Sequence, residues 1–170
     1  MEAELDLSNK SDNYIQLEKN EDVLRFKIKD EEGKDTGNYL EFNLADIELP
    51  LKYQMMIEED KKARAYLQNQ FRIIDKKQDH KGKKLLSSNE EERIKALVNF
   101  YKKEEEIYNI FLGENGVKKL LNGQPLSWTS LGQIDEIIVK YIQPKLETNV
   151  VDIKDRIMKK YNKKQSDIIE

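Results

Sequence analysis

The sequence predicts an α+β fold that is predominantly α-helical, with an N-terminal β-hairpin followed by a small helical bundle. Two short segments alternate apolar and polar residues, as half-buried strands do. In most of the remaining chain, apolar residues recur every three or four positions, which is typical of amphipathic helices. With 170 residues, the chain is long enough to form one domain that buries its own core.

The predicted hairpin lies near the start of the chain. The segment VLRFKIK places Leu24, Phe26 and Ile28 on one face, and NYLEFNL repeats this alternation around Phe42. The segment between them, DEEGKDTG, contains two glycines that allow a turn. A lone two-stranded hairpin is marginal in water. We therefore expect its apolar face to pack on the helices, or its edge to pair with another copy of the chain.

Two long helices are predicted after the hairpin. The first spans about residues 50–77 and begins at Pro50, because proline is favoured in the first turn of a helix. The second is expected to open with a capping box formed by Ser88 and Glu91, to bury Ile94 among its apolar residues, and to stop at Gly113.

Shorter helical segments complete the predicted bundle. A helix of about two turns follows GENG, and the next helix is capped by Ser127 or Thr129. Pro144 should end or kink that helix, because an interior proline removes one backbone hydrogen bond. A last amphipathic helix is predicted over residues 148–163.

The sequence divides into three predicted regions. Residues 1–22 form an acidic lead-in that we expect to be mobile, residues 23–147 form a single hairpin-plus-helices domain, and residues 148–170 form a C-terminal amphipathic helix with a frayed tail. Residues 1–49 carry 6 Lys/Arg against 14 Asp/Glu, so the acidic charge is concentrated at the beginning. The terminal helix is expected to dock on its own domain or on another chain, because so short an amphipathic helix is marginal alone.

The residue types needed for most reaction classes are missing or scattered. The chain has no cysteine and one histidine, His80, in a lysine-rich segment. The glutamate runs at 90–92 and 104–106 consist of neighbours that point in different directions on a helix, so neither run by itself builds an acid/base pair. No nucleotide-binding or calcium-loop motif is present. The sequence predicts a protein without enzymatic activity, cofactor or metal.

Nucleic acid and membrane are not expected as partners. A sequence pI near 5.5 is unfavourable for phosphate binding, and the most basic stretch, residues 76–84, lacks aromatic residues that could stack on bases. No run approaches 18 apolar residues, so a cytoplasmic location is expected. Trp128, in a loop that enters a helix, is expected in the core, although its ring and polar N–H would also suit a partner interface.

The order of features resembles the small tail assembly chaperones encoded beside the tail-tube and tape-measure genes of long-tailed phages and prophages of Gram-positive bacteria. Three features carry the resemblance: the strand pair ending in EFNLADIELPLKYQMMIEE, the long charged helix after it, and the block FLGENGVKKLLNGQPLSWTSLGQIDEIIVKYIQPKLE. The resemblance covers roughly residues 23–147 and lies in the order of these features rather than in a single diagnostic motif.

The resemblance implies a non-enzymatic role in tail assembly. Such chaperones coat the tape-measure protein, help to recruit tail-tube subunits, act in the host-cell cytoplasm and are usually absent from the mature virion. The alternative is a structural or scaffolding adaptor that stays in the assembly, and a homo-oligomer is also compatible with the apolar stripes. Partner contacts are predicted at these residues: Tyr53, Met56, Ile57, Trp128, Ile138, Tyr141, Ile153, Ile157 and Tyr161.

Overall fold

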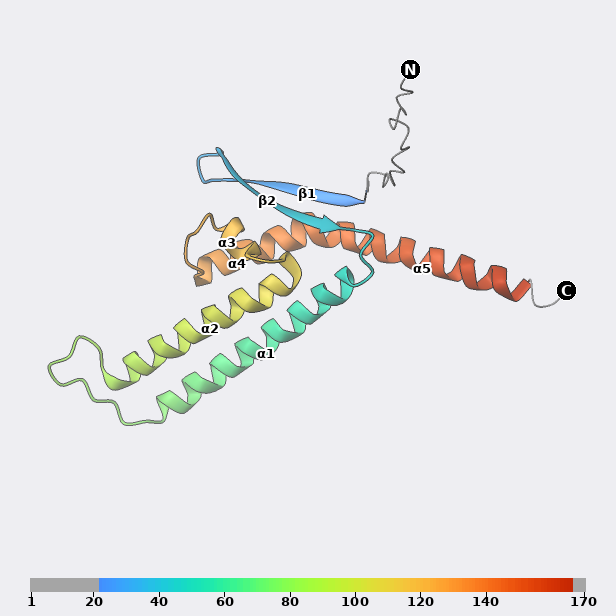
Figure 1. Cartoon of the computed structure of the whole chain (residues 1–170). Coiled ribbons are helices and arrows are strands. Elements are labelled where there is room, and N and C mark those ends of the chain that lie inside the picture. Colours follow the sequence, from blue (N-terminus) through green and yellow to red (C-terminus); the bar gives the residue numbers. More distant parts are fainter. Residues whose placement is uncertain (1–21, 167–170) are drawn as a thin grey trace, which may run out of the picture.

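The computed structural model describes residues 22–166, and the side chains of residues 22–159. The elements follow in the order β1 (Val23–Lys29), β2 (Asp35–Asn43), α1 (Leu49–Asp75), α2 (Ser88–Leu112), α3 (Gly116–Leu120), α4 (Trp128–Ile137), the π-helical turn η1 (Ile138–Ile142) and α5 (Gln143–Ser166) (Figure 1). The predicted fold class, a hairpin followed by helices, is confirmed. The predicted lead-in lies outside the described residues, apart from Asp22.

The β-hairpin is antiparallel, as predicted, and pairs Phe26 with Leu40. Leu40 and Phe42 are each only 2% exposed, because the apolar face of the hairpin packs on the helices. The predicted packing of this face on the helices is therefore confirmed. The turn between the strands is stabilised by Asp30, whose side chain accepts hydrogen bonds from the backbone N–H groups of Glu32 and Lys34.

Helices α1 and α2 form a long antiparallel hairpin that projects from the rest of the molecule (Figure 1). Pro50 lies in the first turn of α1, as predicted, and α2 ends before Gly113. The capping box was predicted one residue too late, because Ser87 and Glu90 form it. Ser88 instead binds the preceding loop: its hydroxyl donates to Asp79 and accepts from the backbone N–H of His80.

The last part of the chain is helical from α4 to the end of α5. Pro144 was expected to end or kink a helix, but helical structure continues through it. The carbonyl that would have accepted its missing N–H lies in η1, where the backbone is already widened to a π-helical turn. Helix α5 also runs without a break across Glu147 and Thr148, where the sequence suggested a boundary between regions.

The core lies where the β-hairpin meets the base of the α1–α2 hairpin. The ring of Phe111 is 5.2 Å from the ring of Phe42 on β2 and 5.2 Å from the ring of Tyr53 on α1. Leu131 and Ile134 of α4 are each 1% exposed in the same cluster. Four elements, β2, α1, α2 and α4, are thus held together by one set of apolar contacts.

Helix α5 docks on its own domain at its beginning. Leu146 is buried, and the Asn149 side-chain amide donates to the Leu44 carbonyl over 2.6 Å. Further along, Val151, Ile157 and Met158 are about half exposed, and the helix points away from the α1–α2 hairpin (Figure 1). Within residues 22–166, none of the helices combines the length and apolar character needed to cross a membrane.

Candidate functional site

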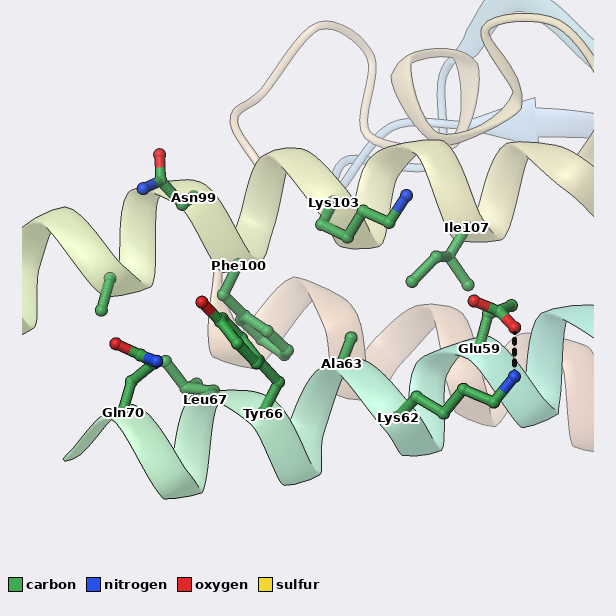
Figure 2. A pocket seen from close by; sticks show the side chains of 11 residues that line it. Glu59, Lys62, Ala63, Tyr66, Leu67, Gln70, Asn99, Phe100, Lys103 and Ile107 are labelled. Carbon is green, nitrogen blue, oxygen red and sulfur yellow. Dashed lines mark hydrogen bonds and ion pairs between the residues drawn. The ribbon is translucent and has the colours of Figure 1, made fainter. Parts of the chain in front are cut away.

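An apolar groove runs between α1 and α2 on one side of the helical hairpin (Figure 2). Its volume is about 410 Å³. Helix α1 contributes Glu59, Lys62, Ala63, Tyr66, Leu67 and Gln70, and α2 contributes Ala96, Asn99, Phe100, Lys103 and Ile107.

Two small residues, one on each helix, lie among the larger side chains that line the groove. They are Ala63 on α1 and Ala96 on α2, and Leu67 and Phe100 add larger apolar side chains to the lining. Tyr66 is 67% exposed, so its ring is available at the groove. An apolar surface of this kind, built from two parallel rows of side chains, suits an amphipathic helix laid along it.

Charged side chains border the groove and are paired with neighbours. Lys62 Nζ lies 2.6 Å from Glu59 Oε1, and Lys103 Nζ lies 3.3 Å from Glu106 Oε2. The ion pair with Lys62 lowers the pKa of Glu59, so this carboxylate stays ionised at neutral pH. The lining supplies contact surface and a charged rim rather than a set of converging reactive groups.

A separate polar cluster lies on the side of the hairpin that faces α4. Arg64 Nε lies 2.7 Å from Asp60 Oδ1, and Arg64 Nη2 lies 3.3 Å from Asp135 Oδ2. Tyr108 donates its hydroxyl to Asp135. Burial alone would lower the pKa of Arg64. The hydrogen bond to Asp60 and the negative charge of that carboxylate outweigh burial, so the pKa of Arg64 is raised. The guanidinium therefore remains a fixed cation that joins α1 to α4.

Glu104 is the most unusual residue of this cluster, which the predicted site did not include. It is 0% exposed, and neither carboxyl oxygen has a hydrogen-bond partner within the described part of the chain. Burial, followed by the nearby Asp60 carboxylate, raises the pKa of Glu104 to about 8. Glu104 is therefore mostly protonated at neutral pH.

The surroundings of Glu104 explain why its place in a buried cluster could not be predicted from the sequence. Glu106, in the same run, is exposed, as expected for neighbours on a helix. The carboxylates that approach Glu104, Asp60 and Asp135, come from α1 and α4, so no spacing within the run could reveal them. Within residues 22–166, no group of three or more acidic or histidine side chains has the arrangement of a metal site.

Trp128 is 62% exposed, so its expected place in the core is wrong. It is the first residue of α4, directly after the N-cap Ser127, and its indole is not enclosed by the domain. Arg64 Cζ lies 5.6 Å from the centre of the ring, a cation–π distance. Trp128 thus covers the outer side of the polar cluster.

The predicted contact residues fall into three groups. Met56 and Ile138 are 1% and 2% exposed, so they belong to the core and offer no contact surface, which corrects their prediction. The reason is that each lies on the innermost line of its apolar stripe. The remaining described side chains are half-buried or exposed: Tyr53, Ile57, Trp128, Tyr141, Ile153 and Ile157. The side chain of Tyr161 lies outside the described side chains.

The structure does not bring the accessible residues together into one surface. Ile57 is on α1, Tyr141 on η1 and Ile157 on α5, and none of them lines the α1–α2 groove. Tyr66 and Phe100, which do line it, were not predicted as contact residues. A usable signal was one alanine among larger residues on each helical stripe, because small side chains leave room between paired helices.

Comparison with known proteins adds no family assignment. No protein-family model, curated protein or solved structure matches this chain. The fold and the groove between α1 and α2 are therefore the basis on which a function can be proposed.

Proposed function

We propose that this protein is a non-enzymatic phage tail assembly chaperone, which binds the tape-measure protein in the groove between α1 and α2. The observation that carries the proposal is the groove itself, an apolar surface of about 410 Å³ on a chain whose residues are 37% charged. High charge keeps the protein dissolved while it displays an apolar surface to a partner. The partner is inferred from the resemblance between the order of features in this sequence and that of phage tail assembly chaperones.

The chemistry of the groove supports a helical partner. A tape-measure helix would place one apolar stripe against Leu67 and Phe100, and its polar flanks beside Lys62 and Lys103. Tyr66 can contribute both ring area and a hydroxyl, the combination that is enriched at protein interfaces. Such binding would shield the apolar stripes of the partner from aggregation during tail assembly in the host-cell cytoplasm.

Co-expression with the tape-measure protein that the proposal implies, followed by affinity capture, tests this proposal. Tyr66→Glu places a charge in the groove at a side chain that is 67% exposed, so the fold should survive. We expect at least a tenfold loss of captured tape-measure protein, about 1.4 kcal/mol of binding free energy or more. Leu85→Glu, at a loop residue that is 90% exposed and outside the groove, is the matched control and should bind as the unmodified protein does.

Analysis of purified particles separates the chaperone from the scaffolding alternative. A chaperone should be captured with the tape-measure protein in cell extracts and be absent from finished particles. If the protein binds through the groove but remains in the particles, the structural or scaffolding role is correct instead. Equal capture by both glutamate variants would refute the role of the groove.

A further inference from the structure

A second groove lies between α5 and the connection from β2 to α1, at the point where the described chain begins. Its volume is about 500 Å³ and its lining is largely apolar. Ile47 is 72% exposed on one side, and Ile157 is 48% exposed on α5. Asp22, the first described residue, is part of the same lining. We propose that residues 14–21 of this chain occupy this groove.

The segment has the right residues within reach. It contains Tyr14, Ile15 and Leu17, which can cover apolar surface. Leu17 precedes Asp22 by five positions, and five extended residues span about 17 Å. Because Asp22 already lies at the groove, Leu17 is within reach of its apolar lining.

The charges at the groove favour the same occupant. Lys145 and Arg156 line it from α5, and neither forms an ion pair within residues 22–166. The segment carries Glu18 and Glu21, which can pair with these two cations. Asp152 also lines the groove and is matched by Lys19 of the segment.

This intramolecular contact would give α5 a second attachment to its own domain. The bond from Asn149 to the Leu44 carbonyl holds one end of the groove, and the segment would cover the apolar residues Ile153 and Ile157 beyond it. Both residues were predicted to contact a partner, so the proposal assigns that stripe to the chain itself. It does not depend on the proposed chaperone function.

Disulfide trapping tests the proposal directly, because the full chain has no cysteine of its own. The pair Leu17→Cys with Ile157→Cys should form a disulfide within one chain under mild oxidation in dilute solution. The control pair, Leu17→Cys with Tyr66→Cys, joins the same segment to the α1–α2 groove and should react at least about tenfold more slowly. Equal rates for both pairs, a disulfide between two copies, or no disulfide at all would each overturn the proposal.

A second measurement does not require disulfide geometry. In the single variant Ile157→Cys, the thiol should be alkylated about threefold faster when Ile15→Glu and Leu17→Glu are added, because the covering segment is displaced. Alkylation of Tyr66→Cys should not respond to the same two changes. An unchanged alkylation rate at position 157 would refute the contact.

Discussion

Arg64 on α1 and Asp135 on α4 form an ion pair, with Nη2 3.3 Å from Oδ2, that fixes α4 beside the helical hairpin. The same guanidinium holds Asp60, and the same Asp135 carboxylate accepts the Tyr108 hydroxyl. Buried Glu104 lies within this arrangement with its pKa raised. The cluster therefore contains one neutral acid whose ionisation would place a further negative charge among existing ones.

Glu104 makes the stability of the fold depend on pH in a defined direction. Its pKa in the folded protein is about 8, above its ordinary value of 4.5. The unfolded chain therefore releases this proton at a lower pH than the folded one. As a result, the stability that Glu104 contributes is fully present below pH 4.5 and is lost as the pH rises through 8. Between these two pH values, the free energy of unfolding falls by at most about 1.4 kcal/mol per pH unit because of Glu104.

Glu104→Gln should remove this slope and raise the free energy of unfolding at pH 8. Urea denaturation at a series of pH values between 5.5 and 8.5 measures the effect. Glu106→Gln, at an exposed residue on the same helix, should leave the slope of the unmodified protein in place. An unchanged pH profile in Glu104→Gln would show that the buried carboxyl does not titrate as described.

The bond from Tyr108 to Asp135 should contribute measurably to the docking of α4. Tyr108→Phe keeps the buried ring and removes only the hydroxyl, so we expect a loss of about 1 kcal/mol in the free energy of unfolding. Tyr101→Phe is the control, because this half-buried tyrosine of α2 makes no hydrogen bond through its hydroxyl within the described residues. Equal losses in the two variants would argue against a specific role for the bond.

Asn89 should be important for the tip of the α1–α2 hairpin. Its side-chain amide donates to the carbonyls of Ile74 and Lys77 over 3.2 and 3.1 Å. A residue at the start of α2 thus supplies hydrogen-bond donors to backbone carbonyls at the end of α1. Asn89→Ala leaves both carbonyls without this donor, and we expect a cost of about 1–3 kcal/mol in thermal or urea unfolding. Asn99→Ala, at an exposed residue of α2, should change stability by less than about 0.5 kcal/mol.

Two glycines should respond to alanine with opposite signs. A Cβ on Gly116 would lie 2.4 Å from Leu112 Cβ, so Gly116→Ala must displace α2 or α3 and should cost about 1–3 kcal/mol. A Cβ on Gly132, inside α4, would meet no atom within 4 Å, and Gly132→Ala should stabilise by about 0.5–1 kcal/mol. Urea unfolding of both variants checks the pair, and a destabilised Gly132→Ala would contradict the packing of α4.

The elements of the fold could be predicted because each has a strong local signal. Period-two alternation around Phe26 and Phe42 identified the strands, and Pro50 and Gly113 marked helix ends correctly. The register of the capping box of α2 was wrong because Ser87 and Ser88 both precede a glutamate by three residues. Contacts from Asp79 and His80 to Ser88 decide between them, and such contacts exist only after folding.

The groove and the buried acid were harder to predict, since both depend on how helices pair. Ile94 was expected to be buried but is 45% exposed, because two helices cover only part of each other's apolar stripes. The groove beside Phe100 is lined by residues of both helices, so it depends on the α1–α2 register. Glu104 meets Asp60 for the same reason, so neither feature follows from one segment alone.

The most direct test of the central claim places a reporter in the α1–α2 groove. The chain has no cysteine, so Tyr66→Cys can carry a single environment-sensitive fluorophore, and His80→Cys in the exposed loop provides the control position. Titration with purified tape-measure segments should give a saturable blue shift from position 66 and none from position 80. Binding of these segments without any change at position 66 would contradict a groove that holds the tape-measure protein.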